Sequence, residues 1–254
     1  MQALNYTYDY PRPALAVDCV VFGVDLDKRT LNVLLVQRGT EPSKGAFALP
    51  GGFVQVSDEG PQGESIEEAA RRELEEKTRV KVSHLEQLYT FGRAGRDPRG
   101  RVISIAHLAL VRSPDHDVVA GDNASRALWI PIETAEKLVL AFDHKDILRL
   151  GKERLAGKVT YTPLAFSLLP DRFSLADAHD LYEVILQRKL NLSNFRKKLL
   201  KLGVLTPAGV KRSRTGGRMP ALFMFDSKRM EQIEKLGFFF NLQPERRRGR
   251  GYRL

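Results

Sequence analysis

The sequence predicts an α+β protein made of two domains, and three observations support this fold class. First, strand-like apolar runs flank one strongly acidic amphipathic helix in residues 1–150. Second, these residues carry 19 Lys and Arg against 22 Asp and Glu, a net charge of −3, whereas residues 151–254 carry 22 against 9, a net charge of +13. Third, the later residues follow the pattern helix, turn, basic helix and hairpin. We expect one domain at 1–157, a second at 158–245 and a basic tail at 246–254.

The composition is typical of a cytoplasmic protein. Hydrophobic residues make up 43% of the 254 positions, which is enough for packed cores. The single cysteine, Cys19, excludes an internal disulfide and fits a reducing compartment. The N-terminus has no basic stretch ahead of an apolar one, and no run approaches the length that spans a membrane. The excess positive charge of the second domain indicates a polyanionic partner.

Runs rich in Val and Leu predict buried strands at 14–24 and 31–37, and further strands are expected at 80–89 and 102–111, with a strand end at 129–131. A helix is predicted at 141–155, where it closes the first domain and leads to the second. His107, His144 and His179 show no metal-ligand spacing, so we expect structural roles for all three.

The acidic helix is the feature around which the first domain is organised. Ser65 and Glu68 have the spacing of a capping box. The apolar positions that follow lie on one face of the helix: Ile66, Ala69, Ala70 and Leu74. Glu67 and Arg71, and likewise Glu68 and Arg72, are four residues apart and are expected to pair.

The segment from residues 49–53, which we call the glycine loop, to the end of this helix resembles the Nudix box. The resemblance is carried by the run Leu-Pro-Gly-Gly-Phe at 49–53, followed by Glu64, the run Arg-Glu-Leu at 72–74, and Glu76. It implies an α/β/α sandwich around a mixed sheet, in which a loop, a helix and a second loop hold a divalent metal against a diphosphate. Glu73 and Glu76 share a helical face and offer the carboxylate oxygens that Mg²⁺ prefers.

Three departures from the family pattern predict a degenerate site. Lys77 stands where the family has a metal-binding Glu, and it lies four residues after Glu73, at pairing distance. Arg79 replaces a Gly, and eleven residues separate Gly52 from Glu64 where the pattern has five. We therefore expect no catalytic residues, no required cofactor, and at most weak Mg²⁺ binding. The degenerate box comprises Glu64, Arg72, Glu73, Glu76 and Lys77.

A second candidate segment is the loop 91–101, which holds four arginines and three glycines. In isolation it fits a solvated loop as well as a phosphate-binding one. Beside the box, the run 89–107 resembles the branch of the Nudix family that handles ADP-ribose. The residues expected to bind such an effector are Arg38, Gly51, Gly52, Phe53, Glu73, Arg93, Arg96, Arg99 and Arg101.

The second domain has the pattern of a winged helix-turn-helix. A short helix at 163–169 precedes a longer one capped by Ser174, and Asn191 caps a third helix with a basic face. Basic residues then flank a glycine tip at 215–217, before a strand at 221–225. The expected DNA contacts are Ser193, Asn194, Lys197, Lys198, Lys201, Arg212, Arg214 and Arg218. A charged protein-interaction domain is the alternative.

The combination resembles the Nudix-related transcriptional regulators of NAD metabolism, the NrtR family. The resemblance implies a homodimeric repressor whose winged helices read a pseudo-palindromic operator on double-stranded DNA. It also implies ADP-ribose, or a related nucleotide, as an effector that weakens operator binding. Two other hypotheses remain: an active ADP-ribose pyrophosphatase with an added DNA-binding domain, and a protein-binding adaptor.

Overall fold

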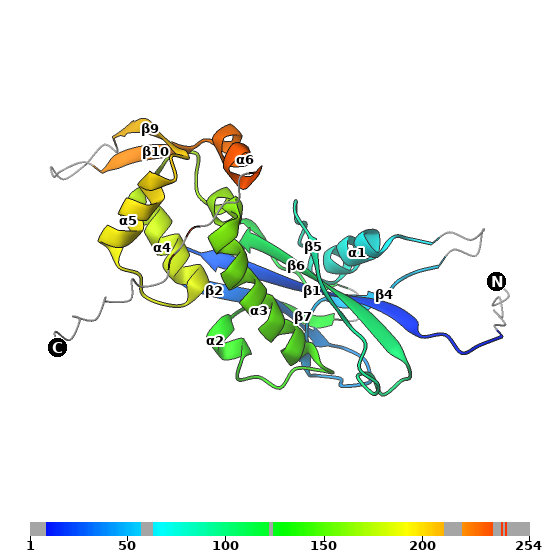
Figure 1. The fold of residues 1–254 in the computed structure, drawn as a ribbon. Coiled ribbons are helices and arrows are strands. Elements are labelled where there is room, and N and C mark those ends of the chain that lie inside the picture. The colour runs from blue at the N-terminus through cyan, green and yellow to red at the C-terminus, as the bar shows by residue number, and fades with distance from the viewer. Residues whose placement is uncertain are drawn as a thin grey trace, which may run out of the picture. The chain divides into compact units, whose positions relative to one another are not determined.

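The computed structural model describes residues 9–56, 63–121, 124–210 and 220–235, together with Phe240 and Leu242. The chain divides into two compact units, Met1–Leu155 and Ala156–Leu254. Figure 1 shows their helices and strands. In the described residues no helix is both long enough and apolar enough to cross a bilayer.

The first unit is built on a mixed sheet of seven strands in the order β3-β2-β1-β6-β5, with β4 paired to β1 and β7 paired to β2 (Figure 1). The strands are β1 (Ala14–Asp25), β2 (Thr30–Arg38), β3 (Phe47–Ala48), β4 (Gly51–Phe53), β5 (Glu86–Phe91), β6 (Val102–Arg112) and β7 (Ala124–Pro131). β1 and β6 run parallel, from the pair Ala14–Val102 to the pair Val24–Arg112, and the other pairs are antiparallel. β1 is buried without interruption from Ala16, because both faces of the sheet are covered there.

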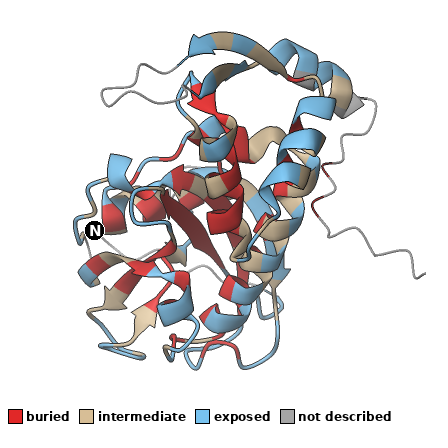
Figure 2. Cartoon of the chain, turned by 90° about the vertical axis from the view of Figure 1, so that its left-hand side faces the viewer, coloured by how far each residue is buried: buried red, intermediate tan, exposed pale blue. Residues whose placement is uncertain are grey.

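Helices cover the two faces of this sheet. The first unit contains α1 (Ile66–Thr78), the 3₁₀ helix η1 (Ser113–Asp115), α2 (Ile132–Ala135) and α3 (His144–Tyr161), whose last residues belong to the second unit. Ala69, Ala70 and Leu74 of α1 belong to one core cluster with Val17 and Cys19 of β1. Figure 2 shows the buried strands between their helices in red. The α/β/α sandwich expected from the sequence is confirmed.

The capping box of α1 is confirmed, since Ser65 Oγ accepts a hydrogen bond from Glu68 N and the Glu68 carboxylate accepts one from Ser65 N. Two predicted elements have wrong bounds. The segment expected as a strand at 80–89 pairs only from Glu86, and Val80 and Val82 are buried as irregular chain packed against α1. The helix expected at 141–155 runs from His144 to Tyr161 instead, and it cannot begin earlier because Phe142 has a φ of 55° that a right-handed helix does not allow.

The second unit combines helices with a three-stranded sheet in the order β8-β10-β9. Its elements are η2 (Pro163–Leu168), β8 (Phe173–Ser174), α4 (Leu175–Leu186), α5 (Leu192–Lys201), β9 (Leu205–Val210), β10 (Ala221–Phe225) and α6 (Ser227–Lys235). The caps expected at Ser174 and Asn191 are confirmed. The core is aromatic: the ring of Tyr182 lies 5.4 Å from that of Phe195 and 5.3 Å from that of Phe240. The short helix expected at 163–169 is a 3₁₀ helix, and α6 is not among the elements expected from the sequence.

Candidate functional site

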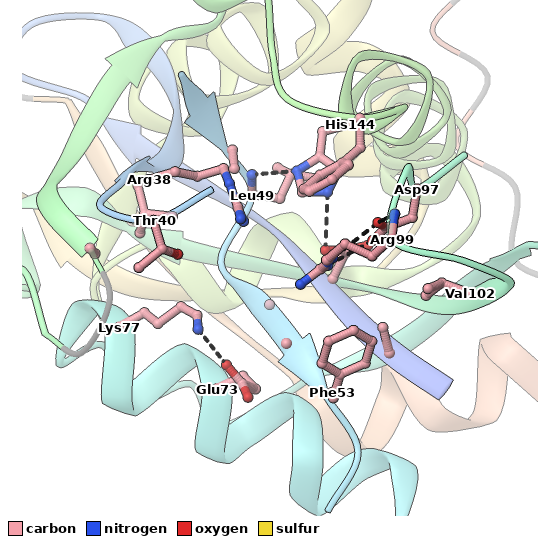
Figure 3. A pocket seen from close by; sticks show the side chains of 18 of the residues that line it. Arg38, Thr40, Leu49, Phe53, Glu73, Lys77, Asp97, Arg99, Val102 and His144 are labelled. Carbon is pink, nitrogen blue, oxygen red and sulfur yellow. Dashed lines mark hydrogen bonds and ion pairs between the residues drawn. The ribbon is translucent and has the colours of Figure 1, made fainter. Parts of the chain in front are cut away.

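A cavity of about 390 Å³ opens in the first unit beside the glycine loop (Figure 3). Seven of the nine predicted effector-binding residues line it: Arg38, Gly51, Gly52, Phe53, Glu73, Arg96 and Arg99. Arg93 and Arg101 are exposed and lie outside the lining, and Arg101 Nη1 donates a hydrogen bond to the Gly92 carbonyl at 2.6 Å. The lining residues that the sequence analysis did not select include Asp18, Thr40, Asp97, Phe142 and His144. Lys77, selected as part of the degenerate box, also lines the cavity.

The two glycines allow the loop to lie directly against buried carboxylates. A Cβ on Gly52 would lie 2.2 Å from Glu73 Oε1, and one on Gly51 would lie 2.6 Å from Asp18 Oδ1. Both distances are shorter than a carbon–oxygen van der Waals contact. A Cβ on Gly51 would also lie 2.2 Å from the Val17 carbonyl oxygen, so only glycine fits there, and the loop backbone forms the wall between α1 and β1.

Arg72 fastens the glycine loop to α1. Its guanidinium makes a bidentate pair with Glu64, with the shorter contact 2.7 Å, and it lies 2.9 Å from Glu73 and 3.0 Å from Glu76. It also donates to the Phe53 carbonyl at 3.1 Å. These hydrogen bonds, that to Glu64 first, raise the pKa of Arg72, and the same bond lowers the pKa of Glu64. The predicted pair with Glu68 is wrong, because that carboxylate caps the helix and Arg72 faces Glu64 instead.

Lys77 neutralises the remaining side of Glu73. Lys77 Nζ lies 2.8 Å from Glu73 Oε2, which confirms the predicted pair. The two side chains are 19% and 8% exposed, so the pair is largely shielded from water. The contact is an ion pair, and among the described residues Oε2 accepts no hydrogen bond. Each oxygen of Glu73 therefore faces one side-chain cation.

These residues do not fit a divalent metal. The carboxylates of the box are Glu64, Glu73 and Glu76, and all three already contact Arg72. Among the oxygens of these three carboxylates, Glu73 Oε2 is buried without a hydrogen bond in the described part of the chain, and the Lys77 ammonium lies 2.8 Å from it. A metal there would lose a carboxylate ligand and meet a like charge.

The floor of the cavity is a network of buried charged side chains. It joins β1, the loop 91–101 (the arginine loop) and Asp143, the residue before α3. Arg96 makes a bidentate pair with Asp143, at 2.9 and 2.6 Å, and reaches Asp18 at 3.3 Å. Asp18 also accepts a hydrogen bond from Ser104 Oγ. All of these side chains are buried, so the network fixes the position of the loop relative to α3.

His144 completes this network as a neutral ring. Its Nδ1 accepts a hydrogen bond from the Leu49 N–H at 2.9 Å, so that nitrogen carries no proton. Its Nε2 lies 3.3 Å from Asp18 Oδ1 and carries the proton toward that carboxylate. Burial lowers the pKa of His144, and this effect is larger than the opposing effect of the Asp18 charge, which raises that pKa. The structural role expected for His144 is thus confirmed.

A layer of arginines and aromatic rings forms the open side of the cavity. Arg99 makes a bidentate pair with Asp97, at 3.0 and 2.7 Å, and its guanidinium lies 4.8 Å from the centre of the Phe53 ring and 5.6 Å from that of Phe142. Arg38 lies 4.9 Å from the centre of the Phe142 ring. Flat rings and guanidinium groups suit a nucleobase and phosphates, respectively.

The second unit presents the expected basic helix. On α5, Ser193, Lys197 and Lys201 are exposed, whereas Asn194 and Lys198 are half-buried. Asn194 and Lys198 line a hollow of about 90 Å³ together with Arg188 and Lys189, at the start of the helix. Arg212, Arg214 and Arg218 lie outside the described residues.

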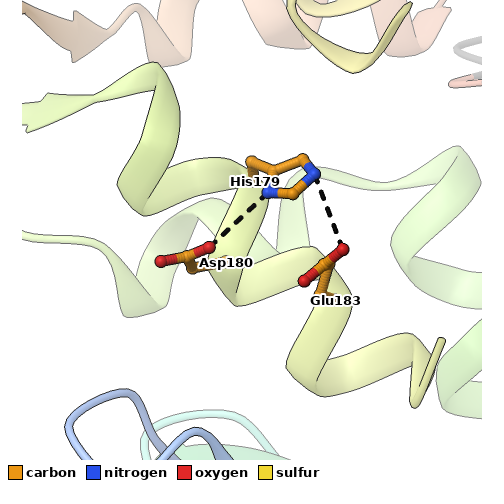
Figure 4. A group of neighbouring side chains, drawn as sticks. All are labelled: His179, Asp180 and Glu183. Carbon is orange, nitrogen blue, oxygen red and sulfur yellow. Dashed lines mark ion pairs between the residues drawn. The ribbon is translucent and has the colours of Figure 1, made fainter. Parts of the chain in front are cut away.

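His179, Asp180 and Glu183 of α4 come close enough to hold a metal ion (Figure 4). However, His179 and Glu183 already brace the turn between α4 and α5. Glu183 accepts hydrogen bonds from Leu190 N at 2.8 Å and from Lys189 Nζ at 3.0 Å, and His179 Nε2 lies 3.0 Å from the Leu190 carbonyl oxygen. This hydrogen bond confirms the structural role expected for His179.

Two family profiles match the chain: the NUDIX domain over residues 12–151, and the NrtR DNA-binding winged helix domain over residues 165–225. The "ADPR responsive transcriptional repressor NtrR" of Acinetobacter baylyi is 37% identical over 213 residues, 84% of this chain and 82% of that protein. The "ADP-ribose pyrophosphatase" of Methanocaldococcus jannaschii is 37% identical over 140 residues, 55% of this chain and 73% of that protein.

Solved structures of NrtR from Shewanella oneidensis are similar as well. The protein complexed with a 27mer DNA has a TM-score of 0.70 at 31% identity, covering 90% of this chain and 99% of that one. Its NUDIX domain complexed with ADP ribose has a TM-score of 0.52 at 35% identity, covering 59% of this chain and 94% of that one.

Proposed function

The chain belongs to the NrtR family, and we propose that it is a DNA-binding transcriptional repressor whose Nudix domain senses ADP-ribose. We propose further that its operators lie ahead of genes for NAD biosynthesis or salvage. The proposal rests on one observation: the chain contains two different candidate binding sites, one in each unit. One is a cavity lined by arginines and aromatic rings beside a degenerate Nudix helix, and the other is a winged helix with exposed polar and basic residues on α5.

The cavity supports ADP-ribose by its chemistry. Arg38, Arg99 and Lys77 supply positive charge for a diphosphate, and the rings of Phe53 and Phe142 supply surfaces for an adenine. The Shewanella NUDIX domain that was crystallised with ADP ribose supports the same ligand class. Bound ligand would contact the Arg96 loop, which is joined to Asp143 at the start of α3. We propose that α3, which continues into the second unit, couples ligand binding in the cavity to the winged helix.

We propose that DNA is contacted by α5 and by the basic hairpin expected around residues 212–218. Lys197 and Lys201 are exposed on α5, on the helix that enters the major groove in this fold class. We propose that a two-fold dimer binds a pseudo-palindromic operator, because one small winged helix reads few base pairs. Replacing Lys197 or Arg214 with Ala is expected to weaken binding to all sequences and to reduce the salt slope by about one.

The test uses a fluorescent duplex selected from a random library with the full-length protein. Anisotropy measures its affinity at several salt concentrations, alone and with ADP-ribose, with AMP as a control nucleotide. We expect ADP-ribose to weaken binding and AMP to have a smaller effect. Failure to select or retard any duplex would favour the protein-binding adaptor, and sedimentation that finds a stable monomer on DNA would contradict the dimer.

The second candidate function is ADP-ribose hydrolysis, which is favoured by the Nudix fold and by the similarity to an archaeal ADP-ribose pyrophosphatase. We propose instead that hydrolysis is negligible, because Lys77 and Arg72 contact all three carboxylates of the box. Loss of the metal removes both the activated water and several kcal/mol of charge stabilisation. AMP release is measured with Mg²⁺ or Mn²⁺, with the archaeal enzyme as positive control. Turnover at rates ordinary for an enzyme would establish the hydrolase.

A further inference from the structure

The Lys77 side chain lies in a shielded position at the cavity and not on the exposed surface of its helix. It lies in the last turn of α1, with its side chain only 19% exposed, and it lines the cavity together with its partner Glu73. A lysine ammonium is strongly hydrated, so it is held in a shielded position only where a partner compensates for the lost water. Glu73 Oε2 is that partner, at 2.8 Å.

We infer that the Lys77 ammonium is a tethered cation that takes the place of a divalent metal, so that the cavity binds a diphosphate without one. The inference rests on the proposed effector and names how its charge is recognised. Figure 3 shows Lys77 and Glu73 on one side of the cavity, with Arg38 and Arg99 on others. The ammonium has three donors, and those that do not face Glu73 remain for phosphate oxygens.

The surrounding charges explain why a metal would not compete. Glu73 Oε1 is bound to Arg72 and Oε2 faces Lys77, so a dication would have to displace a side chain that is covalently attached to the same helix. Glu76, the other carboxylate on that face, also contacts Arg72, at 3.0 Å. The cavity thus keeps a positive charge for a diphosphate but offers no carboxylate site for an ion that would lower the pKa of a bound water.

The first measurement is calorimetric titration of the full-length protein with ADP-ribose, and separately with inorganic pyrophosphate, in EDTA and in excess Mg²⁺. The wild-type dissociation constant for ADP-ribose is expected to agree within about twofold between the two conditions. Removing a charged hydrogen-bond donor typically weakens binding by about 10- to 150-fold, and that loss is expected for Lys77→Met in EDTA. The matched control is Lys81→Met, an exposed lysine next to the same helix and outside the cavity, which should leave affinity unchanged.

A second measurement reads the metal directly, through the electron paramagnetic resonance signal of free Mn²⁺. Wild-type protein is expected to bind Mn²⁺ at least 10-fold more weakly than Lys77→Glu, which removes the ammonium and adds a carboxylate beside Glu73. Equal Mn²⁺ affinity in the two proteins would overturn the inference. So would a wild-type ADP-ribose affinity that falls more than about 10-fold in EDTA, or unchanged binding in Lys77→Met.

The two ligands separate this inference from the proposed function. If pyrophosphate binds in EDTA and requires Lys77 while ADP-ribose does not bind, the effector assignment fails and the tethered cation stands. If ADP-ribose binds only with Mg²⁺, the effector assignment stands and the tethered cation fails. If neither ligand binds in EDTA, the tethered cation is overturned.

Discussion

The buried guanidinium of Arg96 is predicted to contribute more stability than any exposed charge of the first unit. Its side chain is 4% exposed and so is that of Asp143, while that of Asp18 is 8% exposed. Arg96→Met keeps most of the side-chain volume but leaves two buried carboxylates without their cation. Removing one partner of a buried pair typically costs about 3–5 kcal/mol, and we expect a loss of that size in the free energy of unfolding.

The assay uses the single tryptophan of the chain. Trp129 lies on β7, so its fluorescence during urea denaturation reports the first unit alone. Arg93→Met is the matched control, because Arg93 belongs to the same loop but is exposed, and it should change stability by less than about 0.5 kcal/mol. The double variant Arg96→Met/Asp143→Leu should lose less than the sum of the single losses, since it also removes a stranded carboxylate. A loss below about 1 kcal/mol for Arg96→Met would refute the reasoning.

Three further changes have defined outcomes. Arg79→Gly should stabilise the first unit by about 0.5–1 kcal/mol, because Arg79 ends α1 with a φ of 61°, which glycine adopts without strain. Arg79→Ala should give no such gain, and equal unfolding midpoints for the two variants would contradict this prediction. Tyr182→Phe should leave the second unit as stable or more stable by calorimetry, because the buried Tyr182 hydroxyl has no hydrogen-bond partner among the residues that the structure describes; a loss above about 1 kcal/mol would reveal one. Burial lowers the pKa of His144, so its contribution to stability is complete above the unfolded value of about 6.5 and is lost as pH falls through the folded value. His144→Gln should flatten that fall in urea titrations between pH 7 and 5, and an unchanged slope would contradict the assignment.

The sequence was sufficient for the parts of the site that lie close together along the chain. The capping box and the Glu73–Lys77 pair follow from three- and four-residue spacings on one helix, and both are present. The same spacing rule failed for Glu68 and Arg72. Both residues have better partners, in Ser65 and Glu64, and spacing alone does not rank competing partners.

The floor of the cavity lay beyond sequence reasoning because its members are far apart in the chain. Asp18, Arg96 and Asp143 meet only after β1, the arginine loop and the start of α3 have packed. One signal was available: Asp18 is a charged residue inside an otherwise apolar buried strand, and such a residue requires partners. Nothing local distinguishes Arg96, which is buried, from Arg93, which is exposed, because an irregular loop has no periodicity to read.

The central claim is that ADP-ribose and operator oppose each other, and calorimetry tests it from the ligand side. ADP-ribose is titrated into the full-length protein alone and into the protein saturated with its selected duplex. A coupling of about 1–3 kcal/mol predicts a dissociation constant about 5- to 150-fold weaker on the duplex, and linkage requires the same factor for operator affinity at saturating ADP-ribose. An equal dissociation constant in the two titrations would contradict the account, and a tighter one would make ADP-ribose a corepressor.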